Sequence, residues 1–152
     1  MRIWVIAVGR LKAGPEQALV RHYADRINWP LEMREVEEKR PLSAAELRKR
    51  EGALLLAALP EGSTVVALDA RGKAWTSEAF AAEIARWREG GLADLAFVIG
   101  GADGLSEAVR QRAERVLSLG AMTWPHLLVR GMLLEQLYRA QQILAGHPYH
   151  RA

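Results

Sequence analysis

The sequence predicts a single α/β domain over residues 1–152, with a mainly parallel sheet and flanking helices. Two observations predict this fold class. Five short apolar segments typical of strands alternate with segments whose apolar residues recur every three to four positions, as in helices. The chain is 50% hydrophobic, enough for one sizeable core, and it contains no internal repeat or low-complexity segment. Strands separated by helices predict right-handed crossovers between parallel strands.

The chain begins with a strand. Residues 2–8 form a compact apolar run closed by Gly9, which is typical of a buried strand. Pro15 suits the first turn of a helix, and the apolar spacing extends that helix to about residue 27. Residues 31–37 alternate apolar and charged side chains. This alternation predicts a strand near a sheet edge, with one face in water.

The middle of the chain repeats the pattern. A Ser-x-x-Glu sequence at Ser43 predicts a capping box for a helix that runs through residue 59. Residues 64–68 are wholly apolar, as expected of a central parallel strand, and the polar segment 69–73 follows as a loop. Thr76 or Ser77 is the expected cap of a helix that ends at residue 89.

The last third has two further strands. Residues 95–99 form a buried strand that leads into a glycine-rich loop at 100–104, and a helix then runs from Ser106 to about residue 112. After a strand at 115–119, we expect Pro125 at the first position of a final helix, residues 127–145. This helix is too apolar for one buried stripe. We expect its second face to form a subunit interface, although a deeply buried last helix would explain the same pattern.

Composition limits the possible chemistry. The chain has no cysteine, which excludes disulfides, thiolate metal sites and a cysteine nucleophile, and which favours a reducing, cytoplasmic compartment. The first residues resemble a strand more than a signal peptide, and no apolar run approaches the length of a membrane span. The net charge is +3, and the basic excess lies in residues 110–152, which hold six arginines and two glutamates. No spacing of histidines matches a familiar metal site.

Three loops are candidates for binding a ligand, because ligands of open parallel sheets bind beyond the carboxyl ends of the strands. They follow Leu68, Ile99 and Leu119. Few side chains between Gly120 and Trp124 are polar, so that loop offers mainly backbone groups, which suit an adenine edge or a small cofactor. The same features also describe an ordinary strand-to-helix connection. The loop at 100–104 lacks the G-x-G-x-x-G spacing of a dinucleotide site, and no Walker sequence occurs.

The tail after the last helix has an unusual composition. His147, Tyr149, His150 and Arg151 can donate, accept and stack, which are the interactions that hold an RNA base. Gly146 is expected to end the helix, and Pro148 to stiffen the tail. We predict that the tail folds over the cofactor loop as a lid, against the alternative of a frayed end.

Several separated motifs, in order and spanning essentially all 152 residues, resemble those of the RlmH family of SPOUT-class 23S ribosomal RNA pseudouridine N3-methyltransferases. The motifs are Ala7-Val8-Gly9, Leu68-Asp69-x-x-Gly72-Lys73-x-Trp75, Ile99-Gly100-Gly101-x-x-Gly104-Leu105, residues 118–130, Glu135-Gln136-Leu137-Tyr138-Arg139-Ala140 and His147-Pro148-Tyr149-His150-Arg151. The resemblance implies a SPOUT fold with a carboxy-terminal trefoil knot, a homodimer, and S-adenosylmethionine bound in the knot.

The resemblance also implies a reaction and a cofactor site. The reaction is methylation of N3 of the pseudouridine at position 1915 of 23S rRNA, on the assembled ribosome. The cofactor-binding residues carried over are Leu68, Gly100, Leu119, Gly120, Ala121, Met122, Thr123 and Trp124. The chain departs from the family pattern at Ala102-Asp103, where Pro-Glu is usual, and at Trp124, where a less bulky residue is usual. Backbone contacts are expected to survive both changes.

The catalytic candidates are less sharply defined than the cofactor loops. Asp103, His147 and His150 are titratable groups for the proton that leaves N3, and Tyr149 is expected to stack on a base. Arg130 or Arg151 would stabilise the deprotonated base or hold a phosphate. Two other hypotheses stay open, namely a catalytically inactive ribosome- or RNA-binding factor of the same fold and a nucleotide-dependent enzyme with a conventional Rossmann-like fold.

Overall fold

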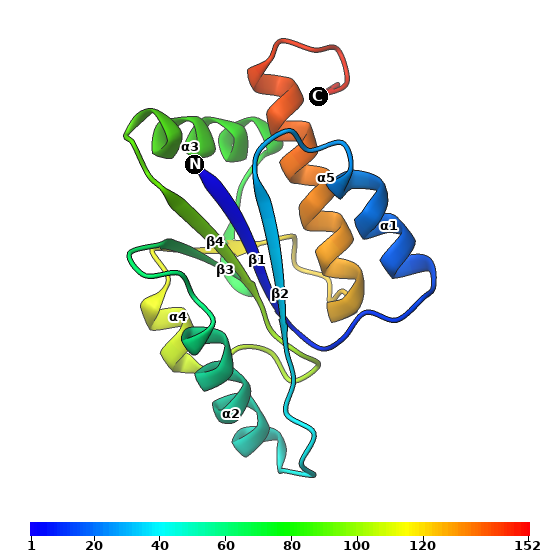
Figure 1. The fold of residues 1–152 in the computed structure, drawn as a ribbon, viewed down its shortest axis with the longest axis vertical. Coiled ribbons are helices and arrows are strands. Elements are labelled where there is room, and N and C mark those ends of the chain that lie inside the picture. Colours follow the sequence, from blue (N-terminus) through cyan, green and yellow to red (C-terminus); the bar gives the residue numbers. More distant parts are fainter.

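The computed structural model describes residues 1–152 as one five-stranded sheet covered by five helices (Figure 1). The strands are β1 (Arg2–Val8), β2 (Leu31–Val36), β3 (Thr64–Ala74), β4 (Asp94–Ile99) and β5 (Arg115–Ser118). The helices are α1 (Pro15–Ala24), α2 (Ala44–Ala57), α3 (Ser77–Glu89), α4 (Glu107–Arg112) and α5 (His126–Leu144). All strand pairs are parallel, in the order β2-β1-β4-β3-β5. The predicted α/β class with a parallel sheet is confirmed.

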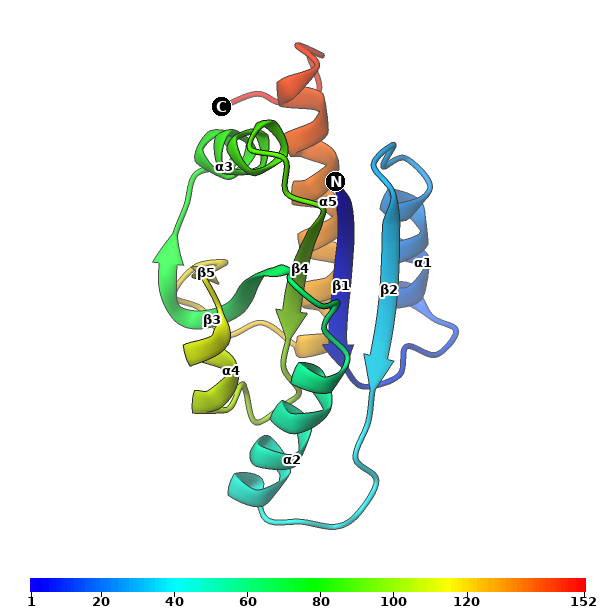
Figure 2. The ribbon, with the colours of Figure 1, turned by 60° about the vertical axis from the view of Figure 1, so that its left-hand side comes forward.

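The sheet separates two hydrophobic layers. Alternate residues of each central strand point to opposite faces, so Val5 and Phe97 join one buried cluster while Ile6 and Val98 join the other. The first cluster includes residues of α1, α3 and α5, and the second includes residues of α2 and α4. Figures 1 and 2 show the two sets of helices on either side of the strands. Burial on both faces explains why the central strands read as continuous apolar runs.

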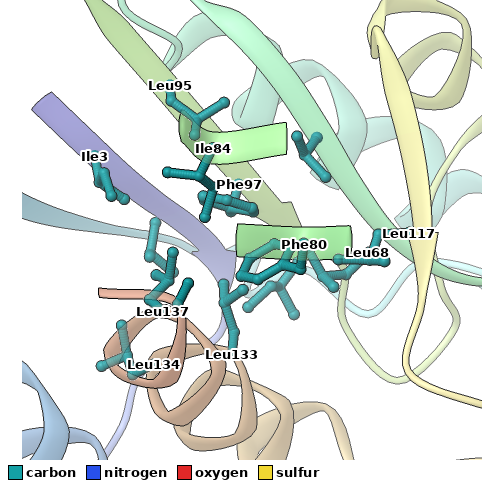
Figure 3. Close-up of a cluster of buried hydrophobic side chains, with 14 of the residues drawn as sticks. Ile3, Leu68, Phe80, Ile84, Leu95, Phe97, Leu117, Leu133, Leu134 and Leu137 are labelled. Carbon is teal, nitrogen blue, oxygen red and sulfur yellow. The ribbon is translucent and has the colours of Figure 1, made fainter. Parts of the chain in front are cut away.

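The centre of the larger cluster is α5. Leu133, Leu134 and Leu137 are fully buried, and Figure 3 shows Leu133 beside Phe80, between α5 and the sheet. Because α5 also packs between α1 and α3, much of its apolar surface is covered within the chain. Burial within the chain therefore accounts for most of the apolar residues of this helix. This was the second of the two explanations that the sequence allowed, the first being a subunit interface.

Two helix caps and the position of the edge strand confirm what the sequence predicted. Ser43 Oγ accepts a hydrogen bond from Glu46 N at 3.2 Å, and Thr76 Oγ1 accepts one from Ala79 N at 3.0 Å. Strand β2 is at the edge of the sheet, and four of its six residues are exposed. Thr76, rather than Ser77, is the cap of α3.

The predicted end of the third strand was wrong. The segment 69–73 was expected as a loop, but β3 continues to Ala74. Leu68 and Lys73 both pair with Leu117, so the residues between them bulge out of the ladder and the chain then returns to β5. Gly72 permits this return, because a Cβ atom there would collide with Val116 O. Polar residues in a bulge do not show the periodicity of a strand. The apolar pattern in the sequence therefore ends before the strand does.

The remaining boundary errors are small. Helix α1 ends at Ala24 rather than residue 27, and α2 ends at Ala57 rather than residue 59. Both continue as single turns, in which Ile27 N donates to Tyr23 O and Leu59 N donates to Leu56 O. The second and fifth strands each end one residue early, and α5 spans His126–Leu144, with Pro125 as its N-cap rather than its first residue. Such shifts are common where a helix or strand frays.

None of the helices combines the length and the apolarity that crossing a bilayer requires.

Candidate cofactor site and adjoining cavity

A cavity of about 250 Å³ lies beyond the carboxyl ends of β4 and β5, beside the bulge of β3. Because β3 lies between β4 and β5 and is parallel to both, its bulge and the loops after β4 and β5 meet at one edge of the sheet. Seven of the eight residues predicted to bind a cofactor line this cavity: Leu68, Gly100, Leu119, Gly120, Met122, Thr123 and Trp124. Ala121, the eighth, lies in the same loop but is not a wall residue. The bulge of β3 and the loops after β4 and β5, which are distant in sequence, therefore form one site.

Two glycines keep backbone accessible at the walls of this cavity. A Cβ atom on Gly100 would stand 2.9 Å from the carbonyl carbon and oxygen of Gly104, so the turn of the glycine-rich loop has no room for a side chain. Gly120 has φ of +117°, a conformation that other residues rarely adopt, and the position of its missing Cβ faces open space. A side chain at Gly120 would therefore both strain the loop and occupy that space.

The loop between β5 and α5 is held by its own polar groups. Gly120 N donates to Ser118 Oγ at 3.1 Å, Ser118 Oγ donates to Gly120 O at 3.0 Å, and Trp124 Nε1 donates to Leu119 O at 3.4 Å. Met122 and Trp124 are nevertheless 74% and 41% exposed, and they are two of only three large hydrophobic residues so exposed in the chain. Such exposure at a cavity rim is typical of a binding surface.

A second, larger cavity of about 520 Å³ adjoins the first. The two share Leu117, Leu119 and Gly120 as walls, so the loop after β5 separates them. The larger cavity lies between α1, α3 and α5, and Glu135 is the only carboxylate among its wall residues. Gln136, another wall residue, accepts a hydrogen bond from Ser77 Oγ at 2.7 Å. A long ligand that fills the smaller cavity would meet the larger one at Leu119 and Gly120.

Glu135 is the centre of a polar cluster on α5. It forms an ion pair with Arg139 NH2 at 2.6 Å and accepts a hydrogen bond from Tyr149 Oη at 3.2 Å. Sequence reasoning gave Glu135, Gln136 and Arg139 no role. The available signal was the i, i+4 spacing of Glu135 and Arg139, which pairs opposite charges on one helix face.

Gly146 ends α5, as the sequence predicted, and the tail begins there. Gly146 has φ of +70°, Gly146 N donates to Ile143 O at 3.1 Å, and His147 N donates to Gln142 O at 2.9 Å. This pair of bonds is the Schellman motif, which ends a helix by turning the chain through a left-handed residue. The tail therefore turns back toward α5 and α3, as Figure 2 shows.

Within one chain the tail lies away from the smaller cavity, so its role as a lid stays a prediction. Residues 147–151 line neither cavity, and so do not cover the smaller one. Tyr149 instead packs edge-on against Tyr138, with ring centroids 4.8 Å apart, and Arg139 lies 4.8 Å from its ring. Glu135 on α5 and Glu78 on α3 supply the carboxylates that Tyr149 and His150 contact there.

Two of the tail side chains are tied to acidic residues. His150 Nε2 is 2.7 Å from Glu78 Oε1, and its Nδ1 is 3.0 Å from Arg139 NH1. Burial first, then a hydrogen bond with Tyr23 and the charge of Glu135, raises the pKa of Tyr149 to about 12. Its hydroxyl group therefore stays protonated at neutral pH and can donate. Because Tyr23 and Glu135 are walls of the larger cavity, the tail borders that cavity.

Arg130, a candidate for contacting the substrate, is buried, and both of its terminal NH groups donate to other parts of the chain. It is 1% exposed and lines neither of the two cavities. Its guanidinium donates to Glu35 Oε2 at 2.6 Å, to Gly9 O at 2.6 Å and to Val8 O at 3.1 Å. These bonds tie α5 to the ends of β1 and β2, so the structure gives Arg130 a stabilising role in place of the expected contact with RNA. The basic residue type was visible in the sequence, but its burial was not.

His126, at the start of α5, also lines the smaller cavity and was not predicted to bind a ligand. Burial first, and the positive charge of Arg130 second, lower the pKa of this imidazole below its usual value. It is therefore neutral at physiological pH. The structure contains no group of three or more His, Asp or Glu side chains placed to hold a metal ion.

The chain is similar in sequence and in fold to known methyltransferases. The family model described as "Predicted SPOUT methyltransferase" matches residues 1–150. A protein of Rhodospirillum centenum named "Ribosomal RNA large subunit methyltransferase H" is 58% identical over 152 residues, covering 100% of both chains. A protein of the same name from Paramagnetospirillum magneticum is 57% identical over 151 residues, covering 99% of both.

Solved structures share the fold at low sequence identity. A probable methyltransferase of Bordetella pertussis superposes with a TM-score of 0.62 at 16% identity, covering 91% of this chain and 95% of that one. The SpoU methyltransferase AviRb of Streptomyces viridochromogenes, in complex with the cofactor AdoMet, has a TM-score of 0.51 at 17% identity, covering 93% and 58%. At these identities the similarity concerns the fold alone.

Proposed function

Because the chain belongs to the SPOUT methyltransferase family, we propose that it transfers the methyl group of S-adenosylmethionine to ribosomal RNA of the large subunit. The observation that carries this proposal is 58% identity, over the full length of both chains, to a large-subunit rRNA methyltransferase. In finer terms, we propose N3 of a pseudouridine in 23S rRNA as the acceptor and the assembled ribosome as the substrate. These relatives are all named as methyltransferases, so they do not support the hypothesis of a catalytically inactive factor.

We place the cofactor in the smaller cavity. Leu68, Ile99 and Leu117 offer an apolar lining for a planar adenine ring, while the loops at Gly100 and Gly120 offer backbone groups to its polar edge. A Cβ atom at Gly120 would fill the space beside that backbone, so the glycine is consistent with a ligand that approaches the main chain closely. When bound there, S-adenosylmethionine supplies an electrophilic methyl group.

The larger cavity is where we place the acceptor base. It adjoins the cofactor cavity at Leu119 and Gly120, so groups held in the two cavities meet at this shared wall. Trp75 and Tyr23 provide aromatic walls, and Glu135 provides a carboxylate that can accept a hydrogen bond from N3–H. Methyl transfer is an in-line displacement, in which alignment of the attacking nitrogen contributes much of the rate. Glu135 would orient that nitrogen, held in turn by Arg139 and Tyr149.

Purified protein, labelled S-adenosylmethionine and intact ribosomes test this proposal. We expect methyl incorporation into 23S rRNA of ribosomes that contain the target pseudouridine, and much less when uridine occupies that position. Calorimetry should show binding of S-adenosylmethionine and S-adenosylhomocysteine but not of NAD or ATP. Binding of NAD or ATP alone would favour the nucleotide-dependent Rossmann-like enzyme, and cofactor binding without any methyl incorporation would favour the inactive factor.

We also propose that the protein is a homodimer. Met132 on α5 and Leu19 on α1 are partly exposed apolar residues at the larger cavity, and a second copy would cover such a groove. Dimerisation would also place two basic carboxy-terminal segments on one RNA-binding surface. Sedimentation equilibrium is expected to give twice the 16.9 kDa chain mass at micromolar concentration. A stable monomer under these conditions would contradict the proposal.

A further inference from the structure

Glu51 on α2 is a buried carboxyl group that the rest of the chain leaves without a partner. The residue is 7% exposed, and its Oε1 atom is buried without any hydrogen bond. Buried charged groups are ordinarily paired or hydrogen bonded, because the loss of water is otherwise not compensated. A buried, unpartnered carboxyl group in a stable helix therefore points to an interaction that the isolated chain does not make.

The carboxyl group lies directly behind the glycine-rich loop of the smaller cavity. A Cβ atom on Gly101 would stand 3.1 Å and 3.2 Å from the two carboxyl oxygens of Glu51, and Gly101 is itself a wall of that cavity. Since Gly101 has no side chain, the Glu51 carboxyl group packs against the backbone of a residue that lines the cavity. A charge on Glu51 acts on the contents of the cavity through protein rather than water, where charges interact more strongly.

The charged groups around Glu51 do not neutralise it. Asp103, in the loop between β4 and α4, is also acidic, and Arg48 on α2 donates to the carbonyl oxygen of Asp103 rather than to either carboxylate. Glu38, in the segment before α2, is paired with Arg40 and Arg50. On α4, Arg110 is paired with Glu107, and on β1 the neighbour of Gly101 is the apolar side chain of Val8. Asp69 and Arg71, the charged wall residues of the cavity, pair with each other, so they do not neutralise Glu51 either.

Building on the proposed function, we propose that Glu51 is the buried counter-charge for the cationic cofactor and makes the site prefer S-adenosylmethionine over S-adenosylhomocysteine. The two molecules differ by the methyl group and by the positive charge of the sulfonium. When the methyl group leaves, the carbon–sulfur electron pair stays on sulfur, which becomes neutral, while the proton displaced from the acceptor nitrogen passes to solvent. A carboxylate behind the loop would therefore hold the substrate form of the cofactor and release the product form.

The protonation state of Glu51 makes the affinity for S-adenosylmethionine depend on pH. Burial first, and the negative charge of Asp103 second, raise the pKa of the Glu51 carboxyl group. The free protein therefore holds this proton to a higher pH than an exposed glutamate does. A bound cation favours the ionised form, so binding of S-adenosylmethionine should release protons and should strengthen as pH rises through the raised pKa. S-Adenosylhomocysteine, which lacks the sulfonium charge, should show both effects more weakly.

Calorimetry on the full-length protein, with both ligands, tests this inference. Titrations at several pH values, in buffers of low and high ionisation enthalpy, measure affinity and proton release together. The variant is Glu51→Gln, which has nearly the same shape and no charge, and the matched control is Glu46→Gln, an exposed glutamate on the same helix. Glu51→Gln should lose about tenfold in affinity for S-adenosylmethionine, the effect of one pKa unit of coupling. Its affinity for S-adenosylhomocysteine should stay within about twofold, and its proton release should vanish.

The folding of the variant is checked by thermal melts. A raised folded-state pKa means that the wild type loses stability as pH rises from the ordinary carboxyl range through the raised value, so Glu51→Gln should be at least as stable at pH 8. Asp103→Asn is a second variant, which should lower the pKa of Glu51 and shift proton release to lower pH.

The outcomes separate this inference from the proposed function. Equal losses for both ligands in Glu51→Gln, or proton release that persists in that variant, would show that Glu51 does not sense the cofactor charge. If the wild type binds neither ligand, the proposed function itself fails. If the wild type binds both ligands with the same pH dependence, only the role of Glu51 fails.

Discussion

Replacing Gly120 by valine is expected to abolish cofactor binding while the protein stays folded. Gly120 is a wall of both cavities, its φ is +117°, and its missing Cβ points into open space. Valine would strain the backbone by about 1–2 kcal/mol and place two methyl groups where a ligand meets the main chain. Overpacking of this kind typically costs a few kcal/mol, so affinity for S-adenosylmethionine should fall on the order of 100-fold or more by calorimetry.

Gly62→Val is the matched control for this variant. Gly62 also has a positive φ, of +73°, and a Cβ atom there would also meet nothing within 4 Å, but it lies in the turn before β3, away from both cavities. The two variants should lose similar stability in urea, and only Gly120→Val should lose the ligand. A folded Gly120→Val protein with wild-type affinity would show that the loop after β5 does not hold the cofactor through its backbone.

Removing residues 147–152 is expected to reduce methyl transfer far more than it weakens cofactor binding. In the structure Tyr149 contacts Glu135, a wall of the larger cavity, so the tail supports the place where we propose that the acceptor base is aligned. Loss of alignment alone can lower a rate on the order of 100-fold. Single-turnover methylation of ribosomes should show a loss of at least about this size. Calorimetry should show cofactor affinity within a few-fold of wild type, because the smaller cavity contains no tail residue.

A chain that lacks only Ala152 is the control for this truncation, because that residue is exposed and forms no hydrogen bond or ion pair. Glu78→Gln adds a finer test, since it replaces the carboxylate that contacts His150 without shortening the chain. It should lower the methylation rate less than the truncation does. A truncated enzyme that keeps the wild-type single-turnover rate would mean that the tail is only a docked end.

Local sequence patterns were sufficient for the element order and for the segments that line the smaller cavity. Apolar runs and helical spacing predicted all ten elements, and serine and threonine caps marked where helices begin. Because the carboxyl ends of parallel strands share one edge, predicting the strands was enough to bring Leu68, Gly100 and Gly120 into one cavity. The carboxy-terminal knot implied by the family resemblance stays a prediction, since neither periodicity nor spacing bears on how the chain is threaded.

The positions of individual polar side chains were decided by contacts that no local pattern records. Arg130 meets Gly9 across 121 residues, Tyr149 meets Glu135 only because Gly146 reverses the chain, and Glu51 meets Gly101 only because α2 packs behind the glycine-rich loop. An arginine, a tyrosine or a glutamate has the same local sequence signature whether it is solvated or buried. The sequence alone therefore determined the sheet, its helices and the loops at its carboxyl edge. Only the tertiary structure decided which charges are buried, which are paired and which face a cavity, because these depend on desolvation and on partners brought together by folding.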